Sequence, residues 1–201
     1  MNRSKFVEIN LLLIIVGLLV LSVNGCSRCS PDEEMYFRVN EELLGETFAD
    51  SLLAIELRIP IDWIDITEDI KFLVESRFED AQLEFEQGLF FQKGYGILEE
   101  MVFMLIFDFD YQKISDDKEE AILTFLSDFT EVTEIFQQGT YLYNDFRFHQ
   151  LTSRENEIIN IKLLGYGHEE GVFLLDYYIH EPKYTNYIET IESSIGSITK
   201  K

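Results

Sequence analysis

An apolar run near the start of the chain limits which part of it can belong to a folded domain. The run extends from Leu11 to Val23, has 13 residues and follows the basic residues Arg3 and Lys5. A secretory signal has an apolar core of about 7 to 15 residues, whereas a transmembrane helix needs about 20. The run is therefore too short to span a bilayer and is typical of a removable signal, so we expect the folded domain to lie beyond it.

The residues after this run predict how the mature chain is attached. Val23, Asn24 and Gly25 lead directly into Cys26, and a small residue before a cysteine resembles the processing site of bacterial lipoproteins, where the thiol receives diacylglycerol. We predict that residues 1–25 are a lipoprotein signal peptide and that Cys26 is the lipidation site. The mature protein would then be anchored to a membrane of the bacterial cell envelope, on the extracytoplasmic side. Because Asn24 is larger than usual at its position, an ordinary cleaved signal or an uncleaved anchor remain alternatives.

The second cysteine adds little to this interpretation. Cys26 and Cys29 form a C-x-x-C pattern, which elsewhere indicates a redox pair or half of a zinc site. No second pattern of this kind follows, and no further cysteine is available for a disulfide. We interpret Cys29 as a second acylation site or a bystander. An exported chain without a disulfide framework must be stabilised by its hydrophobic core.

The composition supports such a core and restricts the partners. The chain is 46% hydrophobic and 14% aromatic, which excludes a disordered acidic tail. Loss of residues 1–25 removes two of 16 basic and one of 38 acidic residues, leaving 14 against 37 and a net charge of −23. This charge disfavours nucleic acid and anionic lipid headgroups, and it favours basic partners or loosely held divalent cations. Acidic charge can also serve solubility alone.

Hydropathy divides the mature chain into two parts. Residues 26–50 are mostly polar and acidic, and we predict a tether there, followed by one domain over residues 51–201. Leu52 to Ile59 partly alternates and stops at a proline, as strands do. From Thr67 the spacing predicts a helix. Its expected core positions are Ile70, Leu73, Val74, Phe78, Ala81 and Phe85.

The rest of the domain predicts a sheet and two more helices. Met101 to Phe107 is continuously apolar, which indicates a central strand buried on both faces. A helix is expected over residues 116–129, where Asp116 can cap it. Short links suggest an antiparallel meander of three later strands. These are Tyr141 to Leu151, Glu157 to Leu164 and Val172 to His180, and a last helix begins near Pro182 and continues to Ile198.

These elements indicate an α+β fold, an antiparallel β-sheet with packing helices in a single domain. The strand that ends at Pro60 with Trp63 soon after, the meander from Tyr141 to Ile179, and the helix ending Ile191 to Ile195 resemble the PsbP-like (DcrB-like) bacterial lipoproteins over about residues 52 to 201. The resemblance implies an α/β/α sandwich in a group of mostly non-catalytic accessory and binding proteins. It assigns no functional residue.

The chain lacks the familiar catalytic and cofactor motifs. It has no G-x-S-x-G, H-E-x-x-H, phosphate-loop or G-x-G-x-x-G pattern. Ser193 and Ser194 lie in the predicted last helix with no histidine near them in sequence. A serine, a histidine and an aspartate could still meet in space, so a hydrolase remains a less favoured alternative. We predict no catalytic residue, no metal site and no cofactor.

The histidines allow one geometric expectation. In the predicted meander, the strands bearing His149 and His180 flank the middle strand, with both histidines near the same end and about 10 Å apart. Shared zinc ligation would require their side chains to converge across that strand. The segment from His168 to Glu170, with help from Asp176, is a weak alternative site for a hard cation such as calcium.

From these observations we expect a lipid-anchored, extracytoplasmic binding or accessory protein that docks a protein partner of the cell envelope, possibly a basic one. The alternative is a lipoprotein that binds a divalent cation or a small ligand. Nucleic acid is excluded as a partner by the net charge of −22 for the full chain.

Overall fold

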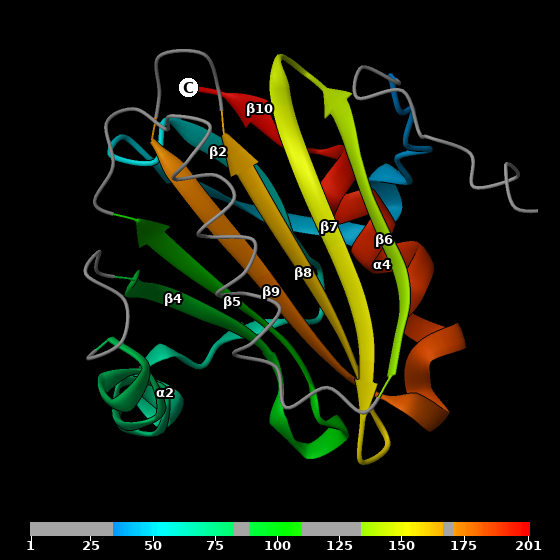
Figure 1. Ribbon diagram of the computed structural model, residues 1–201. Helices are drawn as coiled ribbons and strands as arrows, with labels where there is room; N and C mark the ends of the chain where they lie inside the picture. The colour runs from blue at the N-terminus through cyan, green and yellow to red at the C-terminus, as the bar shows by residue number, and fades with distance from the viewer. Residues whose placement is uncertain (1–33, 83–88, 110–133, 167–170) are drawn as a thin grey trace, which may run out of the picture. The chain divides into compact units, whose positions relative to one another are not determined.

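The computed structural model describes residues 34–82, 89–109, 134–166 and 171–201 (Figure 1). The predicted signal, Cys26, Cys29, the helix expected over residues 116–129 and the segment His168 to Glu170 lie outside these residues. The elements, in chain order, are η1 (Glu41–Leu43), β1 (Leu44–Asp50), β2 (Ile55–Pro60), β3 (Ile64–Asp65), α2 (Thr67–Gln82), β4 (Leu89–Ile97), η2 (Leu98–Glu100), β5 (Val102–Phe109), β6 (Glu134–Tyr143), β7 (Phe146–Glu155), β8 (Ile158–Tyr166), β9 (Val172–His180), η3 (Glu181–Lys183), α4 (Tyr184–Gly196) and β10 (Thr199–Lys200).

The strands form two antiparallel sheets. The large sheet has seven strands in the order β3-β4-β5-β9-β8-β7-β6, and the small sheet has the order β1-β2-β10. β5 lies between β4 and β9, with Val102 opposite Ile179 and Phe109 opposite Val172. The continuous apolar run in β5 is therefore a central strand buried on both faces, as its sequence predicts.

The two faces of the large sheet are covered by different elements. The small sheet and α4 pack on one face, and α2 packs on the other, beside β4 (Figure 1). The first core contains Ile55, Leu57, Ile191 and Ile195 of the covering layer together with Ile161, Leu163 and Tyr177 of the sheet. The second core joins Val74 of α2 to Leu105, Leu164 and Leu174. This large antiparallel sheet with two packing helices confirms the predicted α+β fold class.

The prediction of one strand from Tyr141 to Leu151 is wrong, because a tight turn divides this segment. Asn144 and Asp145 have φ of 48° and 66° and connect β6 to β7 as a two-residue hairpin. Both central residues of a type I′ turn need positive φ, and asparagine and aspartate tolerate it better than most residues. Asn156 and Glu157, with φ of 46° and 66°, make the same kind of turn between β7 and β8.

The tether predicted over residues 26–50 is wrong for Leu44–Asp50, which form β1 and pair with β2. Leu44 and Phe48 of this strand are buried. The residues before β1 also contact the domain, since Glu34 forms a parallel bridge to Leu142 of β6. This segment has few aliphatic side chains, so its hydropathy does not indicate a folded segment. Its conformation depends on contacts with β2, β6 and α4, which are remote in sequence.

Helix α2 begins at Thr67, as predicted, but its buried face is narrower than expected. Val74 is buried and Ile70 partly buried, whereas Leu73 is 70% exposed. The side chains of Phe78 and Ala81, and the whole of Phe85, lie outside the described residues. The expected core stripe is therefore wrong at Leu73, because the described side chains of α2 that pack in the core beside the sheet are Ile70 and Val74, one helical turn apart.

Helix α4 begins close to Pro182, as predicted. Ile191, Ile195 and Ile198 are buried, and Tyr187 and Ile188 pack partly buried against the same core. The helix ends at Gly196 rather than continuing to Ile198. In the part of the chain that the structure describes, no helix combines the length and apolar character needed to cross a membrane.

Candidate functional site

The structure separates the two histidines that the sequence placed together. His149 lies opposite Leu164 of β8, and His180 lies opposite Ile158, six residues away at the other end of that strand. At about 3.4 Å per residue they are roughly 20 Å apart along the sheet. The expected common end is wrong because the turn at Asn144 places His149 near the start of β7 rather than near the end of a strand.

His149 is held in place by structural hydrogen bonds. Its Nδ1 lies 2.7 Å from Oγ1 of Thr140, and its Nε2 lies 2.9 Å from the hydroxyl of Tyr166. The imidazole also stacks on the ring of Tyr166, with centroids 5.6 Å apart. With both ring nitrogens occupied in this way, His149 links β6, β7 and β8 and has no serine beside it among these contacts.

Asp176, considered above as a cation ligand, is a buried acceptor in a polar network on β8 and β9. Its carboxylate accepts hydrogen bonds from Lys162 Nζ at 2.8 Å, Asn160 Nδ2 at 2.6 Å and the Tyr178 hydroxyl at 2.9 Å. The side chains of Asp176 and Lys162 are only 1% and 3% exposed. A buried ion pair with its remaining acceptor sites occupied neutralises itself. Asp176 therefore contributes to the sheet and does not extend a cation site.

Metal ligands do not gather elsewhere among residues 34–82, 89–109, 134–166 and 171–201, since these hold no group of three or more His, Cys, Asp or Glu arranged for a metal ion. The segment from His168 to Glu170 lies outside these residues, so the cation alternative for it stays a prediction.

The two serines of α4 are also used structurally. Ser193 Oγ accepts a hydrogen bond from the backbone N–H of Asn40 at 3.1 Å, and Ser194 Oγ donates one to the carbonyl of Arg58 at 2.7 Å. Both serines are fully buried. Neither is paired with a histidine, so the serine, histidine and aspartate candidates do not converge into a hydrolase site within the described residues.

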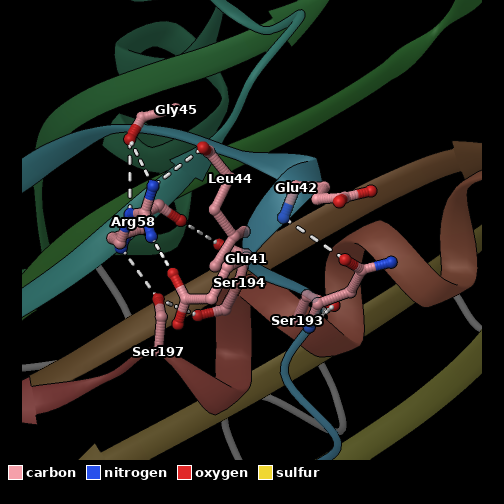
Figure 2. Close-up of polar contacts among 9 residues, drawn as sticks. Glu41, Glu42, Leu44, Gly45, Arg58, Ser193, Ser194 and Ser197 are labelled. Carbon is pink, nitrogen blue, oxygen red and sulfur yellow. Dashed lines mark hydrogen bonds and ion pairs between the residues drawn. The ribbon is translucent and has the colours of Figure 1, made fainter.

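Arg58 of β2 is the centre of this polar junction (Figure 2). Its guanidinium forms an ion pair with Glu41 and donates to the carbonyls of Leu44 at 2.8 Å and Gly45 at 3.3 Å. Its backbone N–H donates to Ser197 Oγ at 2.8 Å. Arg58 thus ties the residues around η1 to β2 and to the end of α4, which is an architectural role.

Among the described residues of the core between the sheets, three aromatic side chains hold a buried polar group without a hydrogen bond of normal geometry. These groups are the indole N–H of Trp63 and the hydroxyls of Tyr141 and Tyr177. Burial raises the pKa of Tyr141 and of Tyr177 well above the usual tyrosine range. These hydroxyls therefore stay neutral at physiological pH and are unsuited to exchange protons with a substrate.

A different kind of feature is found on the surface of α2. Phe72 is 84% exposed and Leu73 is 70% exposed, although both are large apolar side chains. Glu68, Asp69 and Glu75, one helical turn before or after Phe72, are exposed as well. The result is a pair of adjacent apolar side chains bordered by carboxylates, which we call the α2 surface.

The first turn of α2 is fixed firmly to the large sheet. The backbone N–H of Gly94 donates to Thr67 Oγ1 at 3.1 Å, and Ile66 N–H donates to the Gly94 carbonyl at 2.9 Å. A Cβ at Gly94 would come within 2.6 Å of the Ile70 Cδ1, so helix and strand are in close contact there. The α2 surface therefore lies on a helix whose beginning is well positioned.

An ion pair reinforces this attachment. Lys93 Nζ lies 2.8 Å from Asp65 Oδ2, and Asp65 Oδ1 accepts a hydrogen bond from the backbone N–H of Thr67 at 2.9 Å. The hydrogen bond from Lys93, followed by those from Thr67, lowers the pKa of Asp65 to about 2. Asp65 is therefore ionised at physiological pH and holds the start of α2.

Comparison with known proteins identifies the fold. No protein-family model matches the chain, and no curated protein matches its sequence. Among solved structures, the chain is similar to cyanobacterial PsbP (CyanoP) from Synechocystis sp. PCC 6803, with a TM-score of 0.53 over 78% of this chain and 92% of that chain. The fold is PsbP-like. At 11% sequence identity, the likeness confirms the PsbP-like fold that the sequence resembles and extends to the fold alone.

Within this PsbP-like fold, the sequence did not single out the α2 surface. Phe72 and Leu73 follow each other in a helix, so one of them must point away from a narrow core face. The apolar spacing of α2 assigned Leu73 to the core and left Phe72 unremarked. Helical geometry was the signal that could have found this surface, because it places Phe72 on the side of the helix opposite Ile70.

Proposed function

We propose that this protein is a non-catalytic binding or accessory protein of the bacterial cell envelope, anchored by lipid at Cys26 and docking a basic protein partner. The observation that carries this proposal is that the polar residues with catalytic potential are used to hold the fold together. Ser193, Ser194, His149 and Asp176 each make hydrogen bonds that join elements of the fold. Groups used in this way are poorly placed to act on a substrate.

The charge of the chain supports a basic partner. Its formal net charge is −22, and the predicted mature chain carries −23. A strongly negative surface attracts cationic proteins over distances comparable with the Debye length, about 8 Å at physiological ionic strength. The PsbP-like fold is compatible with a binding role, but it does not specify the partner.

A cross-linking pull-down from native envelopes tests the proposal. The full-length protein is compared with Cys26→Ala, which removes the predicted lipid attachment, and each captured protein is released by a salt titration. We expect the wild-type protein in the membrane fraction, Cys26→Ala in the soluble fraction, and a basic partner whose recovery falls steeply between 50 and 500 mM salt, a range spanning roughly a threefold change in Debye length.

Two results would contradict the proposal. Turnover of a generic ester or peptide substrate by purified protein, lost on Ser193→Ala or Ser194→Ala without unfolding, would show an enzyme. The absence of any basic, salt-sensitive partner at low salt would remove the docking role, even if the anchor is confirmed.

A further inference from the structure

We propose that the α2 surface is the docking site, with Phe72 and Leu73 as apolar anchors and Glu68, Asp69 and Glu75 as partners for lysine or arginine side chains. The occupant we infer is a basic protein segment that presents apolar side chains between its cationic ones. This inference rests on the proposed function and adds to it the site and the chemistry of the partner.

The geometry of the helix places the anchors away from the core. Successive residues of an α-helix are rotated by about 100°, so residue 72 lies about 160° from both residue 70 and residue 74. Among the described side chains of α2, Ile70 and Val74 pack against the sheet. Phe72 is consequently on the opposite side of α2, and no described part of the chain covers its side chain, which is 84% exposed.

Exposure of these side chains has an energetic consequence. Fully burying a phenylalanine or leucine side chain contributes about 1.5–3 kcal/mol. Phe72 and Leu73 do not make this contribution within the described part of the fold, so it is available when a partner covers them. Interface anchors are typically aromatic or large aliphatic side chains surrounded by a polar rim. The α2 surface has this composition, with a rim of carboxylates.

The position of α2 favours binding without rearrangement. Its first turn is fixed by Gly94 and by the ion pair between Asp65 and Lys93. Phe72 lies in the second turn, next to this fixed end. A partner would therefore meet anchors on an ordered helix and would lose little affinity to ordering of the site.

The charges decide between classes of occupant. A second copy would place the same carboxylates of Glu68, Asp69 and Glu75 opposite each other, and an anionic bilayer would meet them with negative headgroups. Like charges across an interface cost affinity, whereas a cationic rim on the partner gains it. Lys71 is the single basic residue among these exposed positions from 68 to 75, so the rim stays negative overall. A basic protein segment is the occupant that fits.

The test uses a defined probe, a fluorescent helical peptide of leucine and lysine with its leucines on one face. Binding to the full-length protein is measured by fluorescence anisotropy at low and at physiological salt. We expect the double variant Phe72→Ser/Leu73→Ser to raise the Kd at least tenfold. Leu52→Ser is the matched control, because Leu52 is 78% exposed in the turn between β1 and β2, and its Kd should change less than twofold.

A second pair of variants separates the local rim from total charge. Glu68→Gln/Asp69→Asn/Glu75→Gln should weaken binding and flatten its salt dependence. The control Glu42→Gln/Glu46→Gln/Asp145→Asn removes the same amount of charge at exposed positions elsewhere and should have little effect. Every changed side chain is exposed, so all variants should stay folded, with a slightly lower melting temperature for the rim variant, which loses two carboxylates from the first turn of α2.

The outcomes distinguish this inference from the proposed function. Equal effects of the two charge variants, or unchanged binding by Phe72→Ser/Leu73→Ser, would overturn the α2 surface as the site. If the envelope partner of the pull-down is retained by that double variant, the docking function stands and the site does not. Binding of the wild type to anionic vesicles that is lost on Phe72→Ser would overturn a protein occupant in favour of a membrane.

Discussion

At the scale of single residues, the buried pair of Lys162 and Asp176 is the most unusual feature of the large sheet. Two opposite charges are almost fully removed from water, and they are stabilised by each other and by hydrogen bonds from Asn160 and Tyr178 to Asp176. Removing one charge leaves the other buried without compensation, whereas removing both charges leaves no uncompensated charge in the core. The pair is therefore expected to show strong coupling in its effect on stability.

We predict that Asp176→Asn lowers the free energy of unfolding by about 3 kcal/mol, because the Lys162 ammonium loses its counter-charge. Adding Lys162→Met to that variant should cost less than the two single changes together. Urea denaturation of the wild type, both single variants and the double variant measures the coupling energy. Strictly additive effects would show that the two groups do not interact in solution.

Asp65 leads to a prediction about pH. The pKa of its carboxyl is about 2 in the folded chain, below the ordinary value of 3.8. A carboxyl with a lowered folded-state pKa contributes stability that is present above the unfolded-state pKa and is lost as the pH falls through the folded-state pKa. The contribution of Asp65 should thus be complete near neutral pH and should disappear between about pH 4 and pH 2.

The measurement is the difference in melting temperature between the wild type and Asp65→Ala as a function of pH. We expect the wild type to be more stable at pH 7 and the difference to narrow as the pH falls from 4 to 2. Lys93→Met should reduce the same pH-dependent difference, because it removes the main cause of the lowered pKa. A difference that is independent of pH would contradict the assignment.

At the scale of elements, the hairpin between β6 and β7 shows a turn that the sequence pattern did not predict. Tyr141 to Leu151 mixes aromatic and polar residues and contains no glycine or proline, so the turn within it lacks the strongest turn markers. The pair Asn144-Asp145 nevertheless adopts positive φ at both positions. Because no turn was expected there, His149 was expected near the end of a strand. The turn instead places it near the start of β7.

We predict that Asp145→Gly stabilises the protein by about 0.5–1 kcal/mol, because glycine adopts positive φ without a steric penalty at this turn position. Asp145→Val should destabilise it, since a β-branched residue is strained in that conformation. Chemical denaturation of both variants gives the free energies of unfolding. A loss of stability in Asp145→Gly would show that an interaction of the aspartate side chain outweighs the backbone strain.

Helix α2 illustrates a second limit at this scale. Its periodicity correctly indicates a helix, and Ile70 and Val74 do pack on the sheet. The spacing of apolar residues cannot tell how wide a surface the neighbouring strand offers, so Leu73 was assigned to the core. The exposed pair that forms the α2 surface therefore emerges only when the position of β4 is known.

At the scale of the whole molecule, the residues before β1 belong to the described fold. The ring of Phe37 lies 4.9 Å from the ring of Tyr143 between centroids, and Tyr143 in turn donates a hydrogen bond to the Gly196 carbonyl at 2.6 Å. A Cβ at Gly196 would come within 2.6 Å of the Phe37 Cβ, so this part of the chain fits tightly against the end of α4. These contacts join residues separated by most of the sequence.

We predict that a chain beginning at Glu46 is less stable by at least about 3 kcal/mol than one beginning at Pro31, because it loses burial of Phe37 and Leu44. It also loses the two carbonyls that accept hydrogen bonds from Arg58. Urea denaturation of the two chains measures the difference. Equal stability would show that residues 31–45, which include the start of β1, contribute nothing to the stability of the fold in solution.

Sequence alone determined the features that depend on local patterns. The last helix beginning near Pro182 and the buried central run of β5 follow from side-chain periodicity, which is set by the geometry of each element. The PsbP-like fold was implied by a family resemblance that short sequence motifs carry. The lipid anchor at Cys26 also depends on a local motif, and it stays a prediction.

Tertiary structure alone decided the ordering of the residues before β1, the separation of His149 from His180, the structural use of Ser193 and Ser194, and the exposure of Phe72. Each of these depends on which remote surface is present beside a residue. Local periodicity sets the directions of side chains relative to their own helix or strand, but burial and hydrogen bonding depend on what lies in those directions.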